Sequence, residues 1–118
     1  MNRNKVPYID VMYKDMLYSR IWYDYKTNEV EFENYGDIVV LLPFGVCQTA
    51  SIEDFEDFLE SRCFPKTRAN CKQLLEDLGL SCYDPLSIVE VTHGVQNEDF
   101  CWIRFPGESL KYDDVKFR

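Results

Sequence analysis

The stretch SIEDFEDFLESR, residues 51–62, decides the fold, because the hydrophobic pattern changes there from the period of a strand to the period of a helix. Its apolar residues recur at intervals of three or four, which places them on one side of a helix: Ile52, Phe55, Phe58 and Leu59. Ser51 stands at the N-cap position and Asp54 follows three residues later, as in a capping box. The stretch therefore predicts an amphipathic helix.

Residues 6–42, upstream of this helix, have the pattern of strands. β-Branched and aromatic residues are separated there by polar turns at residues 14–15 and 26–28. Val30 and Phe32 alternate with glutamates, which is typical of a strand with one wet face. The continuous apolar run DIVVLLPFG, residues 37–45, predicts a further strand that is buried on both faces.

Two more helices are predicted downstream. Thr67 is the expected N-cap of the first, and Gly79 supplies its C-terminal stop. Asp84 is the expected cap of the second, with Pro85 at the first helical position and Gly94 as its terminator.

The segment DFCWIRF, residues 99–105, alternates in the manner of a strand and is expected to rejoin the first sheet, followed by a polar tail that is an edge strand or frayed. A chain of 118 residues suits about one hydrophobic core. The sequence thus predicts a single α+β domain, residues 1–118, with an N-terminal antiparallel β-meander of three to four strands, two to three short helices and a closing C-terminal strand.

The charge balance limits the partners. Twenty-one Asp and Glu against thirteen Lys and Arg give a formal net charge of −8, which repels phosphate polymers and anionic membranes, so neither direct nucleic-acid binding nor membrane binding is expected. No apolar run reaches the ~18 residues of a spanning helix, and the start MNRNKVPYID lacks the apolar region of a signal peptide. The odd number of five cysteines favours reduced thiols. We expect a cytoplasmic protein.

Cysteine and histidine side chains raise the question of a metal site. The soft ligands considered are Cys63, Cys71, Cys82, His93 and Cys101. No C-x₂-C pair holds two of them on one tight turn, so zinc is the disfavoured alternative to a protein without cofactor. His93 is explained as a cation at a helix C-terminus, and no nucleophile elbow or glycine-rich phosphate loop occurs. The sequence predicts no catalytic residue and no enzyme.

The joint SRCFPKTRANC, residues 61–71, gathers the cations Arg62, Lys66 and Arg68. An anion site at the start of a helix is one interpretation. We favour internal neutralisation, in which Arg62 faces the carbonyl end of the preceding helix. Lys66 and Arg68 would then pair with acidic residues of that helix, namely Glu56, Asp57 and Glu60.

The negative charge is concentrated on one predicted strand and one predicted helix. These carboxylates are the candidate partner-binding residues: Glu29, Glu31, Glu33, Glu53, Asp54, Glu56, Asp57 and Glu60. Same-face side chains of a strand repeat at about 6.6 Å, so such an array resembles a phosphate ladder to a protein with a basic groove. An ordinary solvated face is the competing interpretation.

Three phrases within residues 52–105 carry a family resemblance: SRCFPKTR, YDPLSIV and DFCWIRF. They resemble a family of short proteins of bacterial mobile elements, some of which are encoded near HipA-type kinases. The size, acidity and lack of catalytic motifs are also similar to anti-CRISPR proteins, which block a host effector by occupying it. The family resemblance implies no particular activity and transfers no active-site residue, whereas the similarity to anti-CRISPR proteins implies a binding function.

Three functions follow as hypotheses. The first is an inhibitor that binds a basic surface of a host nucleic-acid-handling protein, such as a Cas9-type effector, and blocks DNA access. The second is a regulatory partner of a HipA-like toxin or kinase, using an apolar patch with residues such as Tyr18 and Trp22. The third is a zinc-dependent Cys/His domain.

Overall fold

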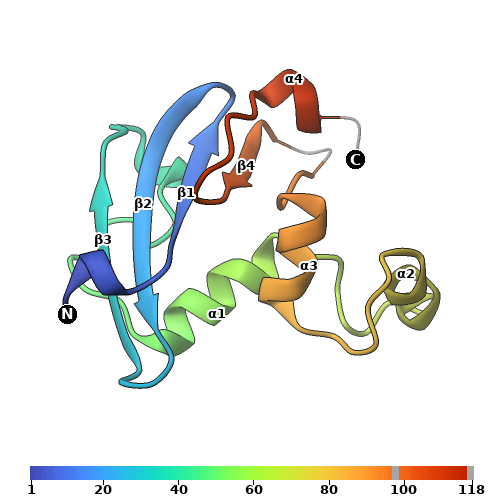
Figure 1. The fold of residues 1–118 in the computed structure, drawn as a ribbon. Helices are drawn as coiled ribbons and strands as arrows, with labels where there is room; N and C mark the ends of the chain where they lie inside the picture. Colours follow the sequence, from blue (N-terminus) through green and yellow to red (C-terminus); the bar gives the residue numbers. More distant parts are fainter. Residues whose placement is uncertain (97–98, 117–118) are drawn as a thin grey trace.

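The fold is built on a four-stranded antiparallel sheet, seen in a computed structural model that describes residues 1–96 and 99–116 (Figure 1). The strand order is β3-β2-β1-β4, which confirms the predicted α+β class with a meander and a closing strand. The strands are β1 (Tyr8–Tyr13), β2 (Met16–Asp24), β3 (Glu29–Asn34) and β4 (Cys101–Arg104).

Both hairpin turns fall where the sequence predicts them. Lys14, with a φ of 52°, lies between β1 and β2, and Asn28, with a φ of 57°, precedes β3. Few residues other than glycine adopt this left-handed conformation, and asparagine is among those that do so most readily. The register of β1 and β2 shifts between Val11 and Met12, as at a β-bulge.

The helices follow the meander and one of them lies after β4. They are α1 (Ile52–Ser61), α2 (Cys71–Asp77), α3 (Pro85–Thr92) and α4 (Tyr112–Val115), with short 3₁₀ turns η1 (Arg3–Lys5) and η2 (Val39–Leu41). The predicted capping box of α1 is confirmed, because Ser51 Oγ accepts from Asp54 N and Asp54 Oδ2 accepts from Ser51 N. Asp84 caps α3 and Pro85 begins it, also as predicted.

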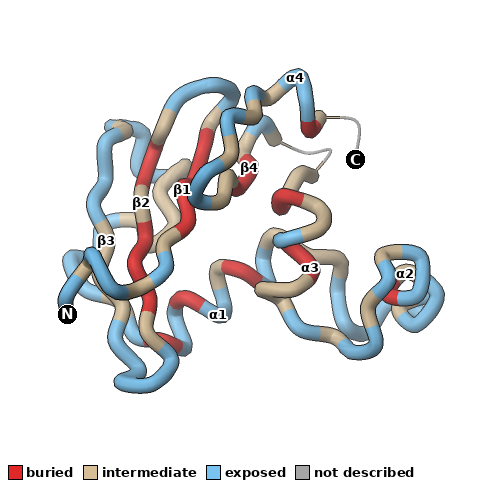
Figure 2. Tube along the Cα trace, viewed as in Figure 1, coloured by how far each residue is buried: buried red, intermediate tan, exposed pale blue. Residues whose placement is uncertain are grey.

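The main core lies between α1 and one face of the sheet. Figure 2 shows buried positions along β1 and β2 and on parts of α1, α3 and β4. Phe55 of α1 is fully buried and stacks on Tyr23 of β2 with ring centroids 4.7 Å apart. Val30 and Phe32 of β3 pack against the same core. The alternating residues of β3 therefore point to the opposite face of the sheet.

A second, smaller core covers part of that opposite face. It consists of Met12, Trp102 and Val115 of α4. The Trp102 indole Nε1 donates a hydrogen bond of 2.6 Å to the carbonyl of Lys14, which joins β4 to the first hairpin turn. Up to residue 116 the C-terminal segment is thus packed through α4, so the predicted edge strand or frayed tail is wrong there. Residues 117–118, the end of that predicted tail, lie outside the described residues.

The prediction of a buried strand over residues 37–45 is also wrong. The chain leaves the sheet after β3, because Tyr35 N and Gly36 N both donate to the carbonyl of Tyr18. Ile38 N then donates to the Tyr18 hydroxyl at 3.1 Å, and the next residues form η2. Hydrogen bonds to Tyr18 and within the segment thus take the place of strand pairing for the backbone of these residues. The side chain of Val40 remains 88% exposed.

Two local predictions around the helix ends need correction. Thr67 does not cap α2, which begins later with Asn70 as an N-cap that makes no side-chain hydrogen bond. His93 is itself the left-handed C-cap of α3, with a φ of 58°. Its ring contacts Glu108 instead of facing the helix carbonyls, since Nε2 lies 2.9 Å from Glu108 Oε2.

Candidate functional site

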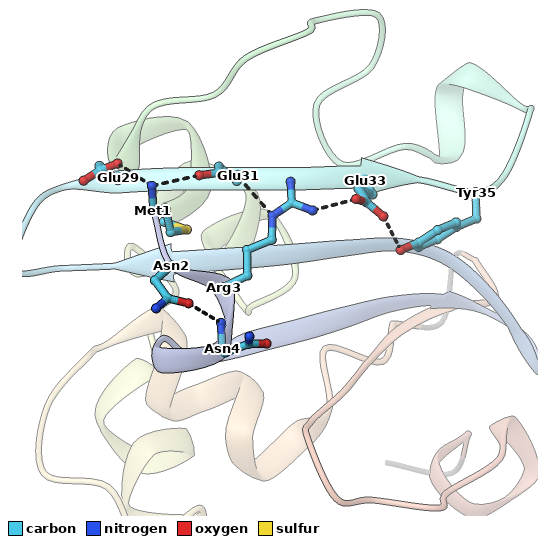
Figure 3. Close-up of polar contacts among 8 residues, drawn as sticks. All are labelled: Met1, Asn2, Arg3, Asn4, Glu29, Glu31, Glu33 and Tyr35. Carbon is cyan, nitrogen blue, oxygen red and sulfur yellow. Dashed lines mark hydrogen bonds and ion pairs between the residues drawn. The ribbon is translucent and has the colours of Figure 1, made fainter.

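The three glutamates of β3 share one face, but cationic groups hold all of them. Arg3 bonds to Glu31 at 3.1 Å and to Glu33 at 2.6 Å (Figure 3). The terminal ammonium of Met1 lies 3.7 Å from Glu29 and 3.5 Å from Glu31. The hydrogen bond from Arg3 lowers the pKa of Glu33 below its usual value. This half of the predicted acidic surface is therefore largely neutralised within the chain.

Arg3 is positioned by more than its carboxylate partners. Its guanidinium lies over the ring of Trp22, 4.1 Å from the ring centroid, in a cation–π contact. Sequence reasoning missed this pairing, because Arg3 lies 28 and 30 positions from its two partners and only the sheet brings them together.

The acidic residues of α1 are in a different state. All five predicted carboxylates are exposed: Glu53, Asp54, Glu56, Asp57 and Glu60. Asp54 is used in the capping box, and the other four form no ion pair within the part of the chain that the structure describes. At about 100° per residue, these four occupy an arc of roughly 100° on the helix. They form one unneutralised stripe on the side of α1 away from Phe55.

A hollow of about 290 Å³ lies beside this stripe. We call it the aromatic–acidic hollow, after Tyr25, Tyr83 and the carboxylates of Glu56, Asp57, Glu60 and Asp84 in its lining. Lys66 and the apolar side chains of Leu59, Pro85 and Leu86 complete that lining. Burial raises the pKa of Tyr25 to about 12, and burial likewise raises the pKa of Tyr83 to about 12. Both phenols are thus uncharged near neutral pH, and they supply apolar walls next to four carboxylates.

A second hollow, of about 400 Å³, flanks α1 and has a different chemistry. We call it the apolar hollow, because Pro43, Phe44 and Phe58 line it together with Asp54 and Asp57. Phe44 is fixed by aromatic contacts to Phe32 and Phe58, with ring centroids 4.8 and 6.2 Å away. Asp57 lines both hollows and so stands between them.

Exposed apolar side chains occur in the chain segment that contributes Pro43 and Phe44 to the apolar hollow. They are Ile38, Val39, Val40 and Val46, with Val40 at 88% and Val46 at 81% exposure. The apolar patch expected at Tyr18 and Trp22 is wrong, because these side chains are only 3% and 9% exposed. Tyr18 is instead the anchor that holds the exposed segment through its hydroxyl.

The joint between α1 and α2 has a structural role that its sequence does not reveal. Arg62 is 9% exposed at its side chain and forms two hydrogen bonds, of 2.8 and 2.9 Å, with Asp99. Its guanidinium also donates to the carbonyls of Gly94 and Cys101. The expected contact with the carbonyl end of its own helix is therefore wrong. Arg62 connects the end of α1 to the segment after α3 and to β4.

The predicted pairing of Lys66 and Arg68 with α1 is also wrong, because neither cation forms an ion pair with a described residue of that helix. Lys66 Nζ lies 6.0 Å from the Tyr83 ring centroid and lines the aromatic–acidic hollow. Arg68 is exposed on the turn before α2. The carboxylates of α1 thus form no ion pair with Lys66 or Arg68, although Lys66 shares the hollow with Glu56, Asp57 and Glu60.

The described residues offer no group of ligands for the zinc alternative. Within residues 1–96 and 99–116, no three His, Cys, Asp or Glu side chains come together as a metal-binding group. All five cysteines are free thiols. Burial raises the pKa of Cys63 to about 12, and its thiol donates to the carbonyl of Leu59. Cys63 therefore behaves as a buried structural thiol.

The fold and this face together define a small acidic α+β domain with an open carboxylate stripe. The chain matches no protein-family model, no curated protein and no solved structure. No helix in the described part of the chain is long and apolar enough to cross a membrane.

Proposed function

We propose that this protein is a cytoplasmic inhibitor that binds a basic, nucleic-acid-handling host protein through the acidic stripe of α1 and blocks its access to DNA. A Cas9-type effector is the target class that the anti-CRISPR-like profile suggests. The protein performs no reaction in this scheme. It acts by occupying a surface that normally receives phosphates.

The observation that carries the proposal is the contrast between the two acidic arrays. The glutamates of β3 bond to Arg3 and the terminal ammonium, whereas Glu53, Glu56, Asp57 and Glu60 form no ion pair with any described residue. Unneutralised charges on one rigid helix attract and orient an oppositely charged partner. The binding surface is thus narrower than the eight carboxylates that the sequence suggests.

The test uses a guide-loaded Cas9-type effector, with DNA cleavage and the association rate as readouts. The double variant Glu56→Lys/Glu60→Lys reverses two charges of the stripe near the C-terminal half of α1, where lysines suit the helix dipole. Glu76→Lys/Glu90→Lys is the matched control, because it reverses two exposed carboxylates on α2 and α3.

We expect wild-type protein and the control variant to inhibit cleavage, and the α1 variant to associate at least tenfold more slowly at low salt. Raising the salt concentration should reduce the difference, because exposed charges are screened. Full inhibition by Glu56→Lys/Glu60→Lys would rule out the acidic stripe as the binding surface. A wild-type protein that leaves cleavage untouched would exclude this effector class, and capture from the native host at low and high salt would then identify the basic target.

A further inference from the structure

The exposed apolar segment next to α1 is held in place on both sides. At its start, Ile38 N donates to the Tyr18 hydroxyl at 3.1 Å. Further along, Phe44 packs on Phe32 with ring centroids 4.8 Å apart. Between and beyond these anchors, Val40 and Val46 remain exposed. Ordered apolar side chains that face water are more typical of interaction sites than of ordinary surface.

This segment is continuous with the apolar hollow beside the acidic stripe. Pro43 and Phe58 line both the apolar hollow and a neighbouring hollow of about 210 Å³ that includes Val40. Val46 lies between Phe44 and Cys47, which also line the apolar hollow. The carboxylates of Asp54 and Asp57 complete this lining. Apolar surface and negative charge therefore adjoin one another on a single face.

We propose that this face, formed by α1 and its two hollows, binds a protein segment in which Lys or Arg side chains stand next to large apolar ones. The cation would enter the aromatic–acidic hollow between Tyr25 and Tyr83, where the rings and four carboxylates attract it and Lys66 supplies a single opposing charge. The apolar side chain would cover Phe44, Phe58 and Val40. This inference rests on the proposed function, because it specifies the chemistry of the partner at the same site.

Charge argues for a different protein as the occupant. In a symmetric dimer through this face, the acidic stripes of both copies would be brought into one interface. Glu56, Asp57 and Glu60 would then meet like charges in a chain whose formal net charge is already −8. A basic segment neutralises these groups, whereas a second copy doubles them.

The test measures binding of three synthetic peptides of equal length to the full chain by calorimetry and by amide chemical shifts. One peptide combines Arg with Leu, one combines Arg with Ser, and one combines Glu with Leu. The Arg/Leu peptide should bind at least tenfold more tightly than either of the others, since it alone supplies both chemistries. This peptide should change the amide chemical shifts of Tyr25, Phe44 and Phe58, which line the two hollows.

Variants separate this inference from the proposed function. Val40→Ser/Val46→Ser should weaken the Arg/Leu peptide about tenfold and leave the Arg/Ser peptide unchanged. Met16→Ser is the matched control, because Met16 is 60% exposed on the β1–β2 hairpin, away from α1. Equal binding of Arg/Leu and Arg/Ser peptides, or no binding of the Arg/Leu peptide at millimolar concentration, would overturn the inference.

Two further outcomes are informative about the occupant. A dimer in sedimentation experiments that Val40→Ser/Val46→Ser abolishes would overturn the inference and assign the face to a second copy. Glu56→Lys/Glu60→Lys could abolish inhibition of the effector while Val40→Ser/Val46→Ser leaves it intact. That result would support the proposed function and overturn the inference that the apolar residues take part in binding.

Discussion

The guanidinium of Arg62 and the carboxylate of Asp99 form a bidentate ion pair, with Nη1–Oδ2 and Nη2–Oδ1 distances of 2.8 and 2.9 Å. The same guanidinium donates 2.9 and 2.8 Å hydrogen bonds to the carbonyls of Gly94 and Cys101. One side chain at the end of α1 thus joins the segment after α3 to the outer edge of β4.

Removing this guanidinium should destabilise the folded protein. Arg62→Met leaves Asp99 without its ion-pair partner and two carbonyls without a donor, so we expect a loss of about 3 kcal/mol in the free energy of unfolding. Chemical denaturation measures it. Arg68→Met, at an exposed position, should stay within about 0.5 kcal/mol of wild type. A similar small effect of both substitutions would contradict the structural role of Arg62.

The same pair predicts an acid-dependent contribution to stability. The hydrogen bond from Arg62 holds the pKa of Asp99 below its usual value. A lowered pKa in the folded state means that the contribution is complete above the unfolded pKa and is lost as the pH falls through the folded pKa. The stability difference between wild type and Asp99→Asn should therefore be largest near neutral pH and shrink below about pH 4. A difference that stays constant down to pH 2 would refute this prediction.

The cysteines should differ in reactivity by position. The thiolate is the reactive form, and burial raises the pKa of Cys63 to about 12, with a smaller rise for Cys101 from the same cause. Cys47 and Cys82 are exposed. In native protein at pH 8, a disulfide reagent should modify these two first and Cys63 only on unfolding, as peptide mapping by mass spectrometry can show. Fast labelling of Cys63 would mean that its surroundings are more open than described.

The burial pattern predicts a large loss of stability for one apolar substitution and almost no change for another. Phe55→Ala removes a fully buried ring that stacks on Tyr23, and should cost about 3–5 kcal/mol. Val40→Ala, at 88% exposure, should change the free energy of unfolding by less than about 0.5 kcal/mol. Urea denaturation distinguishes the two. A large loss for Val40→Ala would show that the segment around η2 packs in solution as the sequence suggests.

The starts of α1 and α3 are predicted correctly because interactions between near neighbours in the sequence determine them. The capping box at Ser51 and the Asp84–Pro85 start of α3 depend on neighbours within one turn, so sequence spacing reveals them. The run at 37–45 misled because hydrophobicity predicts burial only when the topology offers a partner strand. At that point the backbone bonds to Tyr18 instead.

The candidate site divides in the same way. The stripe on α1 follows from helical spacing and was predictable. The neutralisation of Glu31 and Glu33 was not, because Arg3 reaches them only through the sheet. The aromatic–acidic hollow depends on Tyr25 and Tyr83, which come from segments on either side of α1 in the sequence. No periodic signal connects such residues.

The position of β4 beside β1 has a consequence for synthesis in the cell. The Trp102 indole bonds to the carbonyl of Lys14 across 88 positions, and Tyr112 N bonds to Asp15 across 97. At about 5–20 residues per second, a ribosome releases the first hairpin several seconds before the residues that complete its sheet. During that interval the nascent meander presents an unpaired edge of β1, to which another chain could add a strand. The cellular yield of folded protein therefore depends on how well chaperones protect this edge until β4 is made.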